Sequence, residues 1–451
     1  MSDNFTDLAV IGAGPCGLAA AWYARSMGLQ VHLFEAKARA GGRIGTNHEN
    51  IHGERLVVER GPAGWLGEHP LMTELCMELG LTPIESSAAD SHRYLVHNEQ
   101  LVPFPQGAAA MATTRILGGR EKMRVAGERW ADFAPEGTEE TAKEFFERRF
   151  GPGFASKIVA PVVRGLFAGD YETLSIHAAF PKLAEVEYEY GSITKALKKN
   201  PQFFGQHLRS FDGGLNEFTD AMANGLGGGF VPSTPIDTVV QEQGWWFLYA
   251  EGIQVGVARQ IAVCLPVEQT AVVLREYLPG GQSALDRFLG YDLASVAVLY
   301  RRDQIEDACA GFGILAPVDH ASPVLNVQFA HSIFPQHVPD DYLLLRCLMG
   351  GETAPNATQQ SDEELLRILE LDLDQWLGVN GRLQQHWITR VPGGVPHYGL
   401  GHSSALHKIG EALDPNPGLH LGGDAFFGIG ITPAIERGRK IAADAADFRR
   451  A

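Results

Sequence analysis

An α/β fold built around a Rossmann-type dinucleotide-binding unit is predicted by three features near the start of the 451-residue sequence. A short apolar strand, Asp7–Ile11, leads directly into the glycine-rich turn Gly12-Ala-Gly-Pro-Cys-Gly17. An alanine-rich helical stretch follows and ends at Gly28. A second apolar strand, residues 29–34, then ends in Glu35, where a carboxylate can accept hydrogen bonds from ribose hydroxyls.

The three glycines of this turn have separate physical roles. Gly12 makes the tight turn, Gly14 leaves room for a pyrophosphate beside the backbone, and Gly17 lets the helix pack closely on the strand. The N-terminus of the helix offers free N–H groups and a partial positive charge to the phosphates. The residues that we expect to contact the dinucleotide here are Gly12, Gly14, Pro15, Cys16, Gly17, Glu35 and Ala36.

The residues that follow Glu35 discriminate between cofactors. In the run Arg39-Ala-Gly-Gly-Arg43, the adjacent glycines Gly41 and Gly42 let the backbone approach the nucleotide from its other side. Arg43 adds a forked cation that suits a phosphate. This continuation resembles the FAD-containing superfamily of amine oxidases, phytoene desaturases and protoporphyrinogen oxidases, and it is not typical of NAD dehydrogenases. The resemblance implies FAD.

Composition narrows the classes of function. The hydrophobic content of 45% and charged content of 20% are those of a globular protein, and the net charge of −17 argues against nucleic acid as a partner. The first strand begins by residue 7, and we see no apolar run of about 18 residues, so we expect a cytoplasmic location without a signal peptide or a membrane span. Scattered cysteines without a CxxC motif favour free thiols: Cys16, Cys76, Cys264, Cys309 and Cys347.

The pattern along the chain predicts three domains. We expect a discontinuous FAD-binding domain, a mixed α+β substrate-binding domain and a helical insertion that could associate with a membrane. The FAD-binding domain comprises residues 1–85, 210–270 and 405–451, the substrate domain residues 86–106 and 271–404, and the insertion residues 107–209.

Hydrophobic periodicity and turn residues predict the elements within these domains. In chain order they are a strand at 55–58, a helix at 70–80 closed by Gly80, a hairpin turning at Asn98-Glu99, a helix from Thr138 to Phe150, strands at 230–240, 245–250, 260–265, 293–300 and 342–349, a helix at 362–377, a strand at 419–422, and a helix from Pro433 to Phe448.

Motifs beyond the FAD signature resemble the protoporphyrinogen oxidase family and cover nearly the whole chain. They include Glu59-Arg-Gly-Pro62, Arg124-Val-Ala-Gly-Glu128, Gly165-Leu-Phe-Ala-Gly-Asp170, Phe211-Asp-Gly-Gly-Leu215 and Val395-Pro-His-Tyr-Gly-Leu-Gly-His402. The resemblance implies a flavoenzyme that oxidises a porphyrinogen in successive two-electron steps. Molecular oxygen then reoxidises the flavin and gives hydrogen peroxide. The porphyrinogen could be protoporphyrinogen IX or the more carboxylated coproporphyrinogen III.

The resemblance also implies roles for single residues. Arg93 falls where the family pairs an arginine with a propionate of the tetrapyrrole, as a guanidinium fork can do. Asp424 would reach the ribityl chain and pyrophosphate, and the backbone of Ile236 would contact adenine. The residues implied beside the isoalloxazine are Gly61, Pro62, Ala63, Gly64, Gly430 and Ile431. Apolar residues that could line the macrocycle pocket are Phe167, Phe312, Phe334 and Leu345.

The chain departs from the family at several places, and these departures bear on the substrate. Pro396-His397-Tyr398 stands where the family usually has Pro-Gln-Tyr, Val391 stands where several members have a tryptophan near the flavin, and the residues after Ile431 also differ. We therefore keep two alternatives. One is an amine oxidase or desaturase, although Phe426 and Phe427 stand where amine oxidases tend to have a tyrosine cage. The other is a flavin-binding relative that does not catalyse a reaction. We expect the protein to be a monomer or a homodimer.

Three further sequence patterns are better explained without a functional role. His48-Glu-Asn-Ile-His52 matches a zinc protease motif that works only on a helix, whereas this stretch reads as strand or loop, so we expect no metal site. His397 and His402 could be general bases but are more commonly core or surface residues, and we assign no catalytic residue. A cluster of basic residues indicates either a helix face exposed to solvent, which we favour slightly, or contact with anionic lipid. Its members are Arg115, Arg120, Lys122, Arg124 and Arg129.

Overall fold

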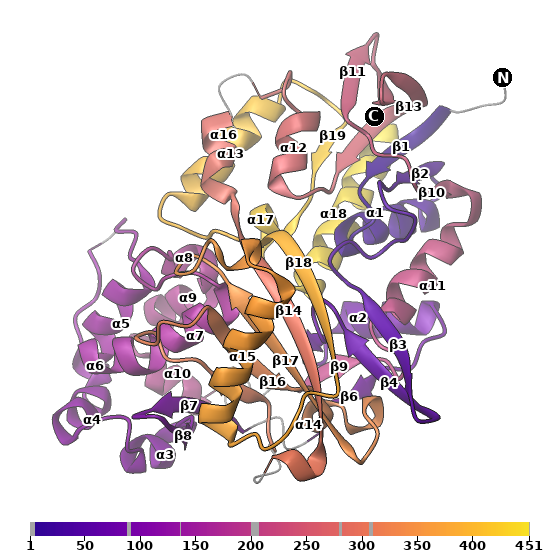
Figure 1. Cartoon of the computed structure of the whole chain (residues 1–451). Coiled ribbons are helices and arrows are strands. Elements are labelled where there is room, and N and C mark those ends of the chain that lie inside the picture. Colours follow the sequence, from indigo (N-terminus) through magenta and orange to yellow (C-terminus); the bar gives the residue numbers. More distant parts are fainter. Residues whose placement is uncertain are drawn as a thin grey trace.

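Two seven-stranded sheets organise the chain, and they confirm the predicted α/β class. The computed structural model describes residues 5–87, 92–135, 137–199, 207–278, 282–305 and 310–450. Figure 1 shows the first sheet above the second, with helices beside each of them and a separate group of helices beside the second sheet. Across the described part of the chain, none of the helices combines the length and the apolar content that a membrane crossing requires.

The first sheet holds the predicted dinucleotide unit. Its strand order is β10-β2-β1-β13-β12-β11, with β19 paired to β13, and the strands from β10 to β13 and β19 are parallel. Their bounds are β1 (Phe5–Ile11), β2 (Val31–Phe34), β10 (Phe230–Val231), β11 (Thr238–Glu242), β12 (Trp245–Ala250), β13 (Ile253–Val263) and β19 (Leu419–Leu421).

Helices cover both faces of this sheet, which explains the continuous apolar run in its central strand. In β1, Leu8 and Val10 pack into one buried cluster and Ala9 and Ile11 into another, as expected for a parallel strand buried on both sides. On the first face lie α1 (Pro15–Ser26), α2 (Pro70–Glu78), α11 (Asn216–Leu226) and α18 (Ile431–Arg450). On the second face lie α12 (Val267–Val273), α13 (Gln282–Leu285), α16 (His402–Leu413) and α17 (Asp424–Phe427).

The prediction of one strand over residues 230–240 was wrong. The chain forms β10 and β11 there, separated by an irregular segment that contains Pro232 and Pro235. Proline has no N–H to donate to a sheet, so a continuous central strand cannot pass through these positions. The strands predicted at 245–250 and 260–265 are confirmed as β12 and as the C-terminal part of β13.

The second sheet has the order β18-β14-β17-β16-β15-β7-β8. Its strands are β7 (Arg93–His97), β8 (Gln100–Pro103), β14 (Gly290–Arg301), β15 (Gly313–Leu315), β16 (Val324–Phe329), β17 (Tyr342–Gly350) and β18 (Gln385–Pro396). The helix predicted at 362–377 is confirmed as α15 (Asp362–Leu377), which packs on one face, and α14 (Ala330–Ile333) follows β16. After β7 and β8, the chain returns to this sheet only at Gly290, because residues just before it, such as Leu274 and Phe288, pack against the first sheet.

Smaller sheets complete the fold. A hairpin joins β3 (Thr46–Ile51) to β4 (Glu54–Glu59), and a three-stranded sheet contains β5 (Trp65–Leu66), β9 (Leu208–Ser210) and β6 (Ile84–Glu85). The predicted hairpin turn at Asn98-Glu99 is also confirmed: both residues have positive φ, of 50° and 63°, as a two-residue type I′ turn between twisted strands requires.

Residues 107–199 form the helical group. Its helices are α3 (Gly107–Thr113), α4 (Gly119–Ala126), α5 (Ala142–Phe150), α6 (Pro152–Phe154), α7 (Ala160–Phe167), α8 (Ile176–Ala179), α9 (Pro181–Tyr190) and α10 (Ile193–Lys199). The helix predicted from Thr138 begins instead at Ala142. Thr141 caps it, since its hydroxyl accepts from the Glu144 N–H while the Glu144 carboxylate accepts from the Thr141 N–H.

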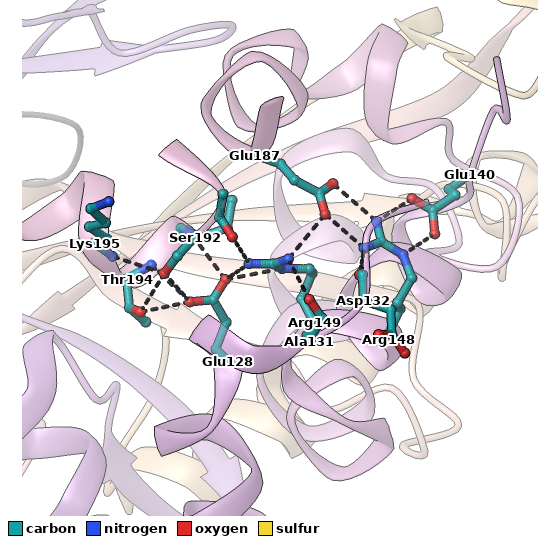
Figure 2. Close-up of polar contacts among 12 residues, drawn as sticks. Glu128, Ala131, Asp132, Glu140, Arg148, Arg149, Glu187, Ser192, Thr194 and Lys195 are labelled. Carbon is teal, nitrogen blue, oxygen red and sulfur yellow. Dashed lines mark hydrogen bonds and ion pairs between the residues drawn. The ribbon is translucent and has the colours of Figure 1, made fainter. Parts of the chain in front are cut away.

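A buried charged network ties this helical group together (Figure 2). The Glu128 and Arg149 side chains have no exposed surface and form an ion pair, and Arg149 also contacts Glu187. Arg148 bridges Glu187 and Glu140 at 2.7 and 2.6 Å. Because each charge has an opposite partner and further hydrogen bonds, the network satisfies charges that would otherwise be costly to bury.

Candidate functional site

The glycine-rich turn has the geometry that the sequence predicts. Gly12 has a φ of 98°, which favours glycine, and a β-carbon there would lie 2.6 Å from the carbonyl oxygen of Cys264. A β-carbon at Gly17 would lie 1.9 Å from the carbonyl oxygen of Gly12, so only glycine lets α1 pack this closely. At Gly14, by contrast, an added β-carbon would meet no described atom within 4 Å.

The open space beside Gly14 lies at the N-terminus of α1, where the backbone suits an anion. Gly14 is the N-cap residue and offers no side-chain cap, Pro15 follows at the start of the helix, and the first turn contains no acidic residue. The N–H groups of the first turn are therefore available, together with the positive end of the helix dipole. The arrangement fits the pyrophosphate of a dinucleotide.

Replacement of Gly14 by alanine should weaken FAD binding without unfolding the protein. Gly14 has an extended φ of −71°, which alanine adopts freely, and the added methyl would project into the space proposed for the pyrophosphate. We expect a loss of about 1–3 kcal/mol, or roughly 5- to 150-fold in Kd, by titration of apoprotein with FAD. The matched control is Gly410→Ala in α16, where a β-carbon also meets no described atom within 4 Å. Equal FAD affinity in the two variants would contradict the assignment.

Glu35 is held in place at the end of β2. Its two carboxylate oxygens accept hydrogen bonds from the backbone N–H groups of Ala13, at 2.8 Å, and Lys37, at 2.9 Å. Only 8% of its surface is exposed. These bonds fix the carboxylate beside the glycine-rich turn and leave lone pairs for two ribose hydroxyls, with Ala36 adjacent in the chain.

The segment after Glu35 closes over the turn from the other side. A β-carbon at Gly42 would lie 3.0 Å from the Cα of Gly14, so this glycine allows the two loops to approach. Arg43 donates to the Asp424 carboxylate and to the carbonyl oxygen of Gly393, both at 2.5 Å. The structure thus brings together two of the predicted cofactor residues, Arg43 and Asp424, as an ion pair.

The turn Gly61-Pro-Ala-Gly64 also depends on its glycines. A β-carbon at Gly61 would lie 2.0 Å from the carbonyl oxygen of Arg43, and one at Gly64 would lie 2.3 Å from that of Arg209. Ala63 lines a cavity of about 20 Å³ between this turn and the second sheet. The two glycines therefore set the close approach of the turn to its neighbours. We propose that Pro62, Ala63 and the two glycines contact the flavin.

The remaining predicted cofactor residues lie on the first sheet and at α18. Ile236 is buried against that sheet shortly after β10, and Gly430, with a φ of 118°, immediately precedes Ile431 at the start of α18. Next to them, the buried Thr432 hydroxyl has no hydrogen-bond partner among the described residues. An unpaired buried hydroxyl at a helix N-terminus fits a polar group of the cofactor, and sequence reasoning did not identify Thr432.

A row of residues crosses the second sheet on its face toward the Gly61 turn. Arg93 pairs with Gly313, Gly313 with Gln328, and Gln328 with Arg346, so the side chains of this row lie on one face. Arg346 donates to the Gln328 side chain and to the carbonyl oxygen of Gly61. These contacts link the row directly to the turn.

Three of the predicted substrate residues lie together at the outer end of this row. The Arg93 guanidinium lies 4.5 Å from the centroid of the Phe312 ring. Phe312 packs against a small buried cluster that contains Phe334, and Phe334 also lines the cavity beside Ala63 and Arg346. The structure therefore combines a half-buried cation with aromatic walls close to the predicted cofactor turn.

The other two predicted substrate residues lie elsewhere. Leu345 is fully buried in the cluster that packs under α15, because side chains alternate along β17 and Leu345 points away from the face that carries Arg346. Its expected place in the substrate pocket is corrected accordingly. Phe167 lies in α7, where it packs edge-on against Phe180 and Tyr398. Tyr398 donates a hydrogen bond to the carbonyl oxygen of Asp424, which places Phe167 one side chain from the cofactor residues.

Arg346 and Glu59 are polar residues of this site that sequence reasoning did not identify as such. Burial lowers the pKa of the Arg346 guanidinium, although the nearby Glu59 counteracts this effect. Burial also raises the pKa of Glu59 to about 7, against hydrogen bonds from the Leu215 N–H and the Thr46 hydroxyl. The one available signal was an arginine inside the otherwise apolar strand of residues 342–350.

The candidate histidines are held in fixed contacts. His397 Nδ1 lies 2.5 Å from the Tyr291 hydroxyl, and His402 Nε2 lies 3.0 Å from the Ala425 carbonyl oxygen. Burial lowers the pKa of both rings and so favours their neutral forms. The HExxH stretch lies in the β3–β4 hairpin, where His48 and His52 cannot share a helical face, and the described residues contain no cluster suited to a metal ion.

Comparison with known proteins identifies the family of the chain. The family described as flavin containing amine oxidoreductase matches residues 15–446. The chain is 26% identical to coproporphyrinogen III oxidase of Bacillus subtilis (strain 168), over 99% of both chains. It is 25% identical to a chloroplastic protoporphyrinogen oxidase of Nicotiana tabacum, over 98% of this chain and 86% of the relative.

A solved structure shows the same fold. The crystal structure of a candidate protoporphyrinogen oxidase from Exiguobacterium sp. 255-15 superposes with a TM-score of 0.85, at 23% identity and over 99% of each chain. The family match spans nearly the whole described chain and includes α1, whose uncapped N-terminus has the geometry that suits a phosphate. The chain is therefore an FAD-dependent oxidase and belongs to the family of flavin containing amine oxidoreductases.

Proposed function

We propose that the chain oxidises a porphyrinogen to the porphyrin, with molecular oxygen as the final acceptor and hydrogen peroxide as the by-product. The observation that carries this proposal is the row Arg93–Gln328–Arg346 beside Phe312 and Phe334, facing the Gly61 turn. Bound FAD supplies the two-electron acceptor. The similarity to porphyrinogen oxidases of Bacillus subtilis and Nicotiana tabacum supports the same substrate class and a role in haem biosynthesis.

The residues of the row would bind and orient the substrate. The Arg93 fork suits a propionate carboxylate, and the faces of Phe312 and Phe334 suit the apolar edge of a macrocycle. Arg346 adds a second guanidinium deeper in the same row, fixed by Gly61 and Gln328. Coproporphyrinogen III carries four propionates and protoporphyrinogen IX two, so a second cation gives a physical basis for discriminating between them.

The amine oxidase alternative has less support from the geometry. Phe426 packs in the core against Phe288, and Phe427 lies under the Arg437 guanidinium at 3.8 Å. Phe426 is only 2% exposed, so these two rings do not form an open aromatic cage. A non-catalytic relative would keep the glycine-rich turn and the α1 N-terminus that bind the cofactor, but it would oxidise neither porphyrinogens nor amines.

A steady-state oxygen assay tests the proposal. Purified holoenzyme is mixed in air with coproporphyrinogen III, protoporphyrinogen IX or a primary amine, while porphyrin fluorescence and peroxide are recorded together. We expect fluorescent porphyrin to appear faster than by autoxidation, with peroxide formed in proportion. Peroxide from the amine without any from either porphyrinogen would favour the amine oxidase alternative.

We also propose that the helical group contacts anionic membranes through its α4 end. Met123 and Trp130 are 72% and 71% exposed, and the Arg129 guanidinium stacks 3.8 Å from the Trp130 ring. Arg120 and Arg124 are exposed on the same segment. Aromatic and basic side chains together suit a headgroup region. The protein should sediment with vesicles containing phosphatidylglycerol but not with pure phosphatidylcholine, and Trp130→Ala should reduce this binding; equal sedimentation with both would argue against it.

A further inference from the structure

Two thiols meet beneath the phosphate-binding turn. Cys16 lies in the first turn of α1, and Cys264 directly follows β13. Their side chains lie side by side, and each thiol shifts the pKa of the other. A β-carbon at Gly422 would lie 2.7 Å from both sulfur atoms, so the two sulfurs flank the same small space that this glycine leaves open. Two residues far apart in the sequence therefore place their thiols side by side.

The surroundings of Cys16 favour its thiolate. The neighbouring Cys264 thiol, the backbone N–H of Gly423 and the nearby Arg437 cation together lower the pKa of Cys16, against the effect of burial. Its position at the N-terminus of α1 acts in the same direction. The neighbouring Cys16 and burial raise the pKa of Cys264, so Cys264 remains the protonated thiol of the pair.

The other described cysteines provide a contrast within the same chain. Cys76 and Cys347 are buried in apolar surroundings, and desolvation raises the pKa of Cys76 to about 11 and raises that of Cys347 as well. Both are free thiols. Since the thiolate is the reactive form, Cys16 is the thiol in the described chain that is best prepared to react with an oxidant.

We propose that Cys16 and Cys264 form a reversible disulfide on exposure to hydrogen peroxide. The Cys16 thiolate attacks one peroxide oxygen, the O–O bond breaks, and hydroxide leaves, which gives a sulfenic acid at Cys16. The Cys264 thiol then attacks that sulfur, and the sulfenic oxygen leaves as water after proton transfer. Two thiols lose two electrons and one peroxide is reduced to two waters.

This disulfide would tie the phosphate-binding helix to the neighbouring strand. Cys16 belongs to α1, and Cys264 follows β13, which pairs with β1 on the same sheet. The bond would close a very long loop of chain and so restrict the unfolded state. It would also hold the α1 N-terminus against the strand end that frames the cofactor turn. We expect oxidation to raise the Tm by about 5 °C and to slow the release of FAD.

Peptide mapping of oxidised holoenzyme tests the proposal without any dependence on turnover. Holoenzyme carrying Cys309→Ser is treated with one equivalent of added peroxide, alkylated after denaturation, and digested without reductant. We expect a Cys16–Cys264 linked peptide that dithiothreitol removes, whereas Cys76 and Cys347 are alkylated as free thiols. In a Cys264→Ser variant, dimedone should instead trap the sulfenic acid on Cys16.

Two results would overturn the proposal. One is recovery of both Cys16 and Cys264 as alkylated thiols after enough peroxide to oxidise Cys76 or Cys347. The other is stable sulfinic acid at Cys16 in the protein that retains Cys264, which would show that Cys264 does not resolve the intermediate. A Cys16→Ala variant, which cannot form either product at this position, serves as the blank for both measurements.

Discussion

Replacement of Glu128 by glutamine is expected to lower the free energy of unfolding by about 3–5 kcal/mol. The Glu128 carboxylate is fully buried and accepts hydrogen bonds from Arg149, Ser192 and Thr194, and from the backbone N–H of Ile193 (Figure 2). A neutral amide would leave the Arg149 guanidinium buried without its closest counter-charge. Urea unfolding followed by circular dichroism measures the effect.

A surface ion pair in the same helical group provides the control. Lys157 pairs with Glu121 at 2.9 Å, but the Lys157 side chain is 40% exposed, so Lys157→Ala should cost less than about 1 kcal/mol. Similar stabilities for Glu128→Gln and Lys157→Ala would contradict the buried network as a stabilising element. A double change of Glu128 and Arg149 to apolar residues should recover part of the loss, because it removes both charges.

The network also predicts the effect of acid. Burial opposes ionisation of Glu128, but hydrogen bonds from Ser192, Thr194 and Arg149 outweigh it and hold the pKa below its usual range. A depressed folded-state pKa contributes stability above the unfolded value of about 4.3 and loses it as the pH falls through the folded value. The difference in stability between wild type and Glu128→Gln should therefore shrink below about pH 4.

Replacement of Arg93 by alanine is expected to raise the KM for a porphyrinogen about 150-fold, with a much smaller effect on flavin content. Arg93 is half-buried and stacked on Phe312, at the outer end of the row that includes Gln328. Loss of a carboxylate's partner at such a position costs about 3 kcal/mol, the low end for buried pairs. Steady-state kinetics together with the flavin absorbance of the purified variant measures both quantities.

Matched variants distinguish binding from a structural role of Arg93. Arg93→Lys keeps the charge but loses the fork, so it should show an intermediate KM. Arg302→Ala removes an exposed guanidinium that directly follows β14 and bonds to the Asp340 carbonyl oxygen, and it should leave KM unchanged. If Arg93→Ala has normal KM, or loses FAD as completely as substrate affinity, Arg93 does not bind the substrate.

The cofactor unit was predictable because its signals are local. The spacing of Gly12, Gly14 and Gly17 encodes a turn whose close contacts the structure confirms, and Glu35 follows on the next strand. Hairpin and helix signals such as Asn98-Glu99 and residues 362–377 are local in the same sense. In these segments, residues close together in the sequence determine the local backbone conformation.

The substrate side could not be derived in the same way. Arg93, Gln328 and Arg346 become neighbours only through the order and register of four strands, which no single segment specifies. Leu345 was expected in the substrate pocket, but successive side chains of β17 point to opposite faces of the sheet. Leu345 therefore faces the core, and its neighbour Arg346 faces the Gly61 turn. Thr432 likewise becomes a candidate cofactor contact only because the structure buries its hydroxyl at the start of α18.

The central claim is that the flavin of this protein accepts electrons from a porphyrinogen. Anaerobic mixing of the purified holoenzyme with coproporphyrinogen III or protoporphyrinogen IX, followed at the flavin absorbance bands in a stopped-flow instrument, tests it most directly. We predict that at least one porphyrinogen bleaches the flavin rapidly, that Arg93→Ala slows the bleaching at low substrate concentration, and that air restores the colour. A flavin that stays oxidised with both porphyrinogens but is bleached by an amine would contradict the claim.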